Sequence, residues 1–191
     1  MSKTFQTLAI LLCASAAVPA SANLVVNGSF ETGDFTGWDQ VNDTSFTGVD
    51  CTGAFATDGD CGAFFGPTDP AGGGILQTIT TVAGGVYTLT FDLQNDGPPP
   101  NAFGLFWDGG FVDLDFDVPM FPYATFTAQL TASGSSTDLG FIFYHEPSFW
   151  DLDNVNLDAA VPEPATWAMM IGGFGLVGGA ARRRATQVSY A

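Results

Sequence analysis

The sequence predicts an all-β domain, folded as a sandwich or a barrel, between two terminal segments that lie outside the fold. Its 191 residues include 24 glycines and 11 prolines, which suits short strands joined by turns. Hydrophobic residues make up 46% and aromatic residues 14%, more than in disordered chains. Apolar and polar residues alternate with period two in several segments. The central part shows no 3.6-residue periodicity, so we expect little helix there.

Five segments carry the strand pattern. Residues 86–93 and 112–117 alternate between apolar and polar, and residues 123–131 read as another strand. Residues 139–144 are almost continuously apolar, which predicts a central strand buried on both faces. Residues 151–157 close the domain. Turn sequences separate these segments at 83–85, 97–100, 108–110 and 133–136.

The charge distribution separates the middle of the chain from its ends. The basic residues are Lys3, Arg182, Arg183 and Arg184, whereas residues 23–161 hold 19 carboxylates and neither Lys nor Arg. Contacts to nucleic-acid phosphates and to anionic lipid headgroups depend on basic side chains. The composition therefore excludes nucleic acid as a partner of this domain and argues against docking on an anionic membrane surface.

Residues 1–22 read as a secretory signal peptide. A basic start precedes a mostly apolar stretch over 4–18, and Ala20 and Ala22 form an A-x-A cleavage pattern. We expect export by the Sec route and cleavage after Ala22, so that the domain comprises residues 23–160. The alternative is a buried core helix.

The C-terminal residues carry a second processing pattern. A Val-Pro-Glu-Pro sequence at 161–164 breaks the chain, and an uncharged, mostly apolar stretch follows over 165–181 before the three arginines. A helix of this length spans about 26 Å, which is enough for a thin bilayer. By the positive-inside rule we expect a single transmembrane helix, with the domain outside and a short cytoplasmic tail at 185–191.

The string over 161–184, VPEPATWAMMIGGFGLVGGAARRR, closely resembles the PEP-CTERM sorting signal in its W-A-M variant. The resemblance implies a substrate of an exosortase, a membrane-embedded cysteine transpeptidase of Gram-negative bacteria that make exopolysaccharide. It also implies an inner-membrane intermediate, cleavage near the Pro-Glu-Pro, and delivery to the cell surface or a biofilm-type polysaccharide matrix. The alternative is a plain C-terminal anchor without processing. The residues that match the signal are Pro162, Glu163, Pro164, Trp167, Arg182, Arg183 and Arg184.

Cys51 and Cys61 are the cysteines that stay after the signal peptide, with Cys13, is removed. A secreted chain with two cysteines most simply forms one disulfide, and closing so short a loop stabilises the fold by about 2–3 kcal/mol. Two free thiols are the alternative. A metal site that combines two cysteines with the distant His145 is a poor match to known ligand spacing.

The two ends of the domain are similar to galactose-binding-like jelly rolls, the superfamily of many carbohydrate-binding modules. The similarity rests on N-L-V-V-N-G-S-F-E at 23–31, on the following Gly37-Trp38, and on L-D-N-V-N-L at 152–157. It implies a jelly-roll β-sandwich in which the first and last strands run together. It also implies a structural Ca²⁺ held by Glu31 and Asp153, with backbone carbonyls near residues 27–29 completing the oxygen ligands. Asn154 stands where a second Asp is usual.

The excess of carboxylates favours a bound cation on separate grounds. Carboxylates without basic partners repel one another, and a Ca²⁺ that binds the folded state would stabilise it by mass action. Most of these carboxylates are nevertheless expected on solvated faces, where salt screens them. The alternating Asp113, Asp115 and Asp117 would share one face of a strand and could gather a cation loosely.

We find no catalytic signature and predict that the protein is not an enzyme. His145 is the single histidine and is expected to be a hydrogen-bonded structural residue. Neither a G-x-S-x-G nor an H-E-x-x-H sequence is present. Glycoside hydrolysis needs only two carboxylates, so a glycan-active enzyme is the less favoured alternative.

Carbohydrate binding is the activity that the composition favours. Aromatic rings can stack on sugar faces while Asp and Asn fix the hydroxyl groups, although most large aromatic side chains of a sandwich belong to its core. Trp107 with Asp108, and Trp150, stand beside turns and are our candidate ligand-binding residues. The competing hypothesis is a structural matrix or surface protein with no dedicated ligand site.

Overall fold

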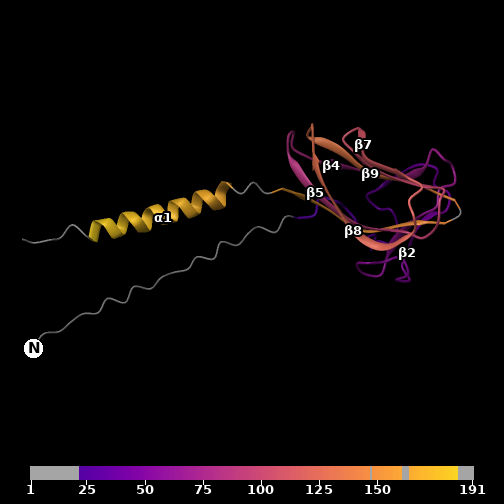
Figure 1. Ribbon diagram of the computed structural model, residues 1–191, viewed down its shortest axis with the longest axis horizontal. Coiled ribbons are helices and arrows are strands. Elements are labelled where there is room, and N and C mark those ends of the chain that lie inside the picture. Colours follow the sequence, from indigo (N-terminus) through magenta and orange to yellow (C-terminus); the bar gives the residue numbers. More distant parts are fainter. Residues whose placement is uncertain (1–21, 147, 161–163, 185–191) are drawn as a thin grey trace, which may run out of the picture.

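The computed structural model describes residues 22–146, 148–160 and 164–184. The predicted signal peptide, except its last residue, Ala22, and also Pro162, Glu163 and the tail at 185–191 lie outside these residues. The described domain is a sandwich of two antiparallel five-stranded sheets, as predicted, and contains no helix (Figure 1). We name the two sheets A and B.

Sheet A lies above sheet B in Figure 1. In spatial order, sheet A consists of β1 (Asp39–Asn42), β4 (Gly73–Thr80), β9 (Ser136–His145), β6 (Asn101–Trp107) and β7 (Gly110–Phe116). Sheet B consists of β2 (Thr47–Asp50), β3 (Gly62–Phe65), β10 (Trp150–Ala159), β5 (Val86–Asn95) and β8 (Phe121–Thr131). The five predicted strand segments correspond to β5, β7, β8, β9 and β10 and are confirmed. β9 lies in the middle of its sheet, as expected for an apolar run.

The core lies between the sheets and is rich in aromatic rings. Phe65 of β3 and Phe143 of β9 stack across it with ring centroids 4.1 Å apart. Each fully buried side chain of this kind contributes about 1.5–3 kcal/mol relative to exposure. Among the residues that the structure describes, the buried hydrophobic side chains lie between Val25 and Leu157, so the sandwich has its own core.

The first and last segments of the domain run together, as the jelly-roll resemblance implies. Leu24 N–H donates to the Leu157 carbonyl at 2.9 Å, and Val155 N–H donates to the Gly28 carbonyl at 2.9 Å. A Cβ at Gly28 would lie 2.0 Å from the Val155 carbonyl oxygen, so only glycine allows this approach.

The stretch expected to be helical forms α1 (Pro164–Arg184), which lies apart from the sandwich in Figure 1. Among the described residues, no helix combines the length and the apolarity that crossing a membrane requires. The helix expected over 165–181 is present within α1, and its insertion in a membrane stays a prediction.

Candidate functional site

The loop over residues 51–61 lies against the outer face of sheet B. Its ends are joined by the Cys51–Cys61 disulfide, which confirms the predicted pairing. Its centre is bound by Asp153 of β10, whose Oδ2 accepts hydrogen bonds from Thr57 N–H at 2.6 Å and Asp58 N–H at 2.9 Å. This face of the sandwich is therefore occupied by the chain itself.

Glu31 binds the same loop from the N-terminal segment. Its Oε1 accepts hydrogen bonds from the N–H groups of Asp60 at 2.9 Å and Cys61 at 2.8 Å. Ca²⁺ needs six to eight oxygen ligands. Within the described residues, no three acidic, His or Cys side chains gather as a metal-binding group. The structure gives Glu31 and Asp153 the role of fixing the loop, and calcium at this position stays a prediction.

Two further carboxylates of sheet B differ in their environment. Burial opposes ionisation of Asp92, but hydrogen bonds from Thr125, Thr57 and Asn154 outweigh it and hold the pKa of Asp92 below its ordinary value. Asp151 is 1% exposed, and its Oδ1 has no hydrogen-bond partner among the described residues. Burial, assisted by the charge of Asp96, raises the pKa of Asp151 to about 7.

His145 is a structural residue, as predicted. It is buried at the end of β9, where Nε2 lies 2.9 Å from Asn95 Oδ1 and Nδ1 accepts a hydrogen bond from Ser148 N–H at 3.2 Å. Burial lowers the pKa of His145, so the ring is neutral at pH 7. With both nitrogen atoms engaged, it is not available as a general base.

Trp107 and Trp150 belong to the core, which corrects the expectation that they form exposed ligand platforms. Trp107 is 5% exposed and donates its indole N–H to the Thr131 carbonyl at 2.9 Å. Trp150 is 1% exposed and donates to the Tyr144 carbonyl at 3.1 Å, while its ring borders a cavity inside the sandwich. Asp108 sits at the β6–β7 turn, where its Oδ2 accepts a hydrogen bond from Ser133 N–H.

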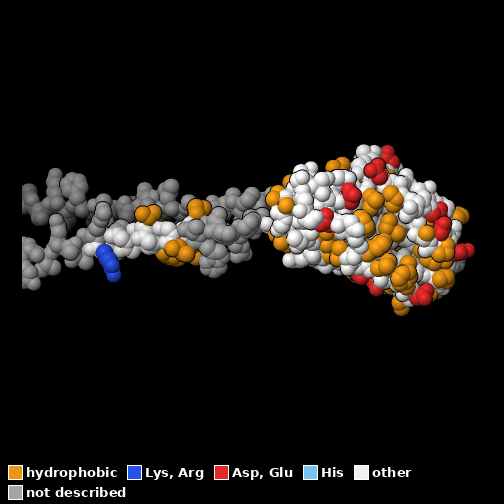
Figure 2. Space-filling view, turned by 90° about the horizontal axis from the view of Figure 1, so that it is seen from above, with side chains coloured by type: hydrophobic (Ala, Val, Ile, Leu, Met, Phe, Trp, Pro, Cys, Tyr) orange, Lys and Arg blue, Asp and Glu red, His pale blue; other side chains and the backbone are white. Residues whose placement is uncertain are grey.

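The outer face of sheet A is the open, apolar surface of the domain, and we call it the sheet A face. Phe111, Leu114 and Phe116 of β7 point outward from it and are 51%, 45% and 68% exposed. Ile142 and Tyr144 of β9 share this face and are half-buried. Figure 2, which views the molecule from above, shows a continuous hydrophobic patch bordered by acidic side chains.

Small residues lie beneath these side chains and make the face a shallow groove. Gly104 of β6 lies under Phe111, whose ring would come within 2.7 Å of a Cβ there. Phe106 packs edge-on against the Phe111 ring at a centroid distance of 5.7 Å. The hollow between Ala71, Gly104, Phe116 and Tyr144 has a volume of about 190 Å³. The exposed rings and the small residues beneath them therefore form a shallow apolar groove.

Polar groups border the apolar groove on the sheet A face. Asp138 of β9 accepts a hydrogen bond from the Thr78 hydroxyl of β4 at 2.7 Å, and both side chains are exposed. Thr80 projects from the same side of β4. An exposed carboxylate and hydroxyl groups beside aromatic rings form the combination that sugar recognition needs.

The apolar face was not evident from the sequence, in which Leu114 and Phe116 alternate with Asp113 and Asp115. The two carboxylates are exposed, as expected. Their register with Leu105 and Phe103 places them on the inner side of this edge strand, while Leu114 and Phe116 lie on the outer side and are exposed as well. Alternation defines two faces of a strand but does not decide which is inside.

Residues 160–184 match the family model described as the PEP-CTERM protein-sorting motif. The chain carries a PEP-CTERM sorting signal. The match agrees with the residues singled out from the sequence and is confined to the C-terminal part of the chain. A search of curated protein sequences found no match.

The sandwich is similar to solved carbohydrate-binding modules. A family 61 module, TmCBM61, solved in complex with β-1,4-galactotriose, superposes with a TM-score of 0.59 at 16% identity, covering 73% of this chain and 100% of the module. The CBM22-1 xylan-binding domain of Paenibacillus barcinonensis Xyn10C gives 0.52 at 18%, covering 76% and 99%. The C-terminal family 22 module of Clostridium thermocellum Xyn10B gives 0.54 at 14%, covering 70% and 91%. At these identities the likeness establishes the fold alone, a β-sandwich of the kind found in these modules.

Proposed function

We propose that this PEP-CTERM protein is exported, processed by an exosortase, and placed at the cell surface or in the exopolysaccharide matrix, where its sandwich binds a neutral polysaccharide without catalysis. The sorting motif supports the route. The carbohydrate-binding-module fold supports the class of ligand, because the similar structures are mostly non-catalytic sugar-binding modules.

The observation that carries the proposal is the exposure of Phe111, Leu114 and Phe116 on the sheet A face. Large apolar side chains that stay exposed side by side on a soluble domain mark a binding site. They border a shallow apolar groove, and the faces of pyranose rings carry C–H groups that pack on aromatic rings. The exposed Asp138 carboxylate can accept hydrogen bonds from sugar hydroxyls.

The charge of the domain defines the kind of polysaccharide. Residues 23–161 contain 19 carboxylates and neither Lys nor Arg, so the domain would repel an anionic glycan. A neutral chain meets no such penalty. Xylan and β-1,4-galactan are suitable first probes because both are neutral and the similar modules in the comparison bind xylan or β-1,4-galactotriose.

Affinity electrophoresis tests the proposal with the sandwich, residues 23–160, and soluble neutral polysaccharides in the gel. We expect retardation by at least one of them, and loss of that retardation in the double variant Phe111→Ala/Phe116→Ala. The control variant is Val82→Ala, an equally exposed apolar residue at a distant turn. Retardation that persists in the double variant would move the site elsewhere. If no neutral glycan retards the sandwich, including the native exopolysaccharide, the competing hypothesis of a surface protein without a ligand site is favoured.

The structural Ca²⁺ at Glu31 and Asp153 is a separate proposal. A melting temperature that falls when EDTA is added and recovers with CaCl₂ would support it. A melting temperature that EDTA does not change would reject the Ca²⁺ site. Glu31 and Asp153 would then serve only to fix the 51–61 loop.

A further inference from the structure

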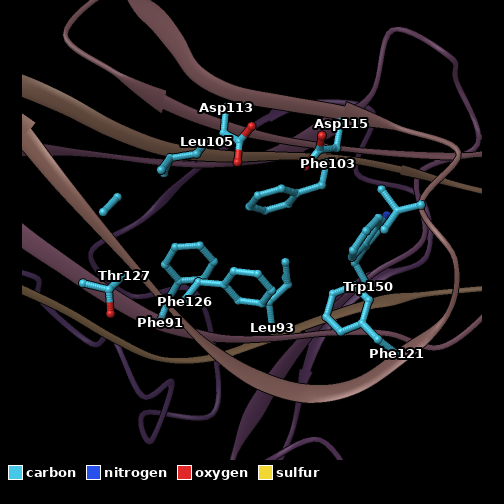
Figure 3. Close-up of a pocket in the computed structure, with 12 residues that line it drawn as sticks. Phe91, Leu93, Phe103, Leu105, Asp113, Asp115, Phe121, Phe126, Thr127 and Trp150 are labelled. Atoms are coloured by element: carbon cyan, nitrogen blue, oxygen red, sulfur yellow. The ribbon is translucent and has the colours of Figure 1, made fainter.

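A cavity of about 140 Å³ opens between β7 and β8, the neighbouring edges of the two sheets (Figure 3). It is lined by core side chains, by the inward face of β8 and by Asp113 and Asp115 of β7. We call it the edge cavity. It lies on the opposite side of β7 from the sheet A face, so the two sites are independent.

Five aromatic rings form a closed circuit around the edge cavity. Neighbouring ring centroids are 5.6 to 6.0 Å apart at every step of the circuit. A regular ring of that spacing has its centre about 5 Å from each centroid, and an aromatic face attracts a cation over about 6 Å. The Phe121 ring stands at 62° and 65° to its two neighbours, whereas the Phe91 and Phe126 rings are nearly parallel at 17°. In order, the rings are Phe91, Phe103, Trp150, Phe121 and Phe126.

The two carboxylates of β7 face this circuit. Asp113 and Asp115 are the register partners of the buried Leu105 and Phe103, so they occupy positions that point into the sandwich. Figure 3 shows both on the β7 side of the edge cavity, across from Phe126. Neither forms a hydrogen bond or a salt bridge with a side chain of the described residues, and no Lys or Arg exists between residues 23 and 161 to pair with them.

Asp113 and Asp115 are exposed although they stand on the inner side of β7, so their solvated charges lie where the edge cavity opens. A purely protective role, in which charges on an edge strand prevent sheets of two molecules from joining, would explain Asp113 and Asp115. It would not explain why the space beneath them is open and lined by five rings. A cation in that space would satisfy both features at once.

We propose that the edge cavity binds a compact organic cation, a quaternary or protonated amine, with the aromatic circuit around the ammonium group and the carboxylates of Asp113 and Asp115 at its entrance. Aromatic faces attract such groups through their quadrupole, and the carboxylates add a direct charge interaction. The proposal is one of binding alone and includes no chemical step.

Calorimetric titration of the sandwich, residues 23–160, with choline tests the proposal. The neutral isostere of choline, 3,3-dimethylbutan-1-ol, is the matched ligand, because it has the same shape without the charge. We expect saturable choline binding and isostere binding weaker by about tenfold. No saturable binding of choline, or equal binding of the isostere, would overturn the proposal.

Variants assign the binding to the edge cavity. Asp113→Asn/Asp115→Asn should weaken choline binding by about tenfold and leave the isostere unaffected. Asp117→Asn is the control, since it removes a charge from the same strand end outside the cavity lining, at a positive-φ position that Asn tolerates. Phe126→Leu, which keeps an apolar side chain but removes an exposed ring, should weaken choline by about threefold. An equal loss of choline affinity in Asp117→Asn would show that the effect comes from the net charge of the domain, and would reject the edge cavity as the site.

Discussion

Replacing Asp151 by Asn should stabilise the protein at neutral and alkaline pH. Asp151 is buried on the outer face of sheet B, its Oδ1 has no hydrogen-bond partner among the described residues, and its pKa is raised from 3.8 to about 7. Between these two values the folded state keeps a proton that the unfolded state has released. The free energy of unfolding contributed by this group is therefore complete below pH 4 and is lost as the pH rises toward 7.

The size of the effect follows from the shift. One pKa unit corresponds to about 1.4 kcal/mol, so the difference between 3.8 and about 7 bounds the cost of ionised Asp151 at about 4 kcal/mol. Asn carries no charge but leaves a buried amide that costs about 1–3 kcal/mol if it finds no partner. We expect Asp151→Asn to gain about 2 kcal/mol at pH 8, and to lose most of that gain at pH 5.

Urea unfolding of wild type and Asp151→Asn at pH 5, 6, 7 and 8, followed by tryptophan fluorescence, measures this difference. The control is Asp158→Asn, a partly exposed carboxylate on the same strand, whose free energy of unfolding should differ from wild type by a similar amount at each pH. A difference between wild type and Asp151→Asn that does not grow between pH 5 and pH 8 would refute the reasoning. It would mean that the carboxyl group is ionised at little cost in the fold.

Three other predictions concern the loop and the processed ends. Glu31→Gln should lower the free energy of unfolding by about 1–3 kcal/mol, because the amide accepts the hydrogen bonds from the Asp60 and Cys61 N–H groups more weakly. If the variant matches wild type in urea unfolding, Glu31 does not fix the loop. Trypsin should leave the urea-unfolded mature chain intact while chymotrypsin degrades it, because residues 23–161 contain neither Lys nor Arg. Mass spectrometry of the native protein should show a chain that begins at Asn23 and no longer contains Trp167. A native chain that retains Trp167 would contradict processing at the sorting signal.

The strands that were predicted show regular alternation or, for β9, a continuous apolar run. The strands that were missed show neither pattern, for identifiable reasons. β4 places Gln77 among buried isoleucines, and this polar residue is accommodated because its amide exchanges hydrogen bonds with the N–H and carbonyl of Val26. β6 runs from Asn101 to Trp107 with a glycine inside, which obscures its period. β1, β2 and β3 have only four residues each, too few for a pattern to emerge.

The candidate site was harder to predict than the fold, because burial is a property of the assembled sheets. Trp107 and Trp150 stand near turns, yet both lie in the core because a backbone carbonyl accepts each indole N–H. β7 is an edge strand of sheet A and all of its residues are exposed, so its alternation did not reveal which side faces the core. The disulfide and the sorting motif were predictable, since each depends on local sequence alone.

The central claim is that the sheet A face binds a neutral polysaccharide, and NMR mapping tests it most directly. Titration of ¹⁵N-labelled sandwich with a xylo- or galacto-oligosaccharide should shift amide signals of β6, β7 and β9, above all around Phe111, Phe116 and Tyr144, while signals of the 51–61 loop stay fixed. Shifts confined to that loop, or no shift at saturating oligosaccharide, would contradict the claim.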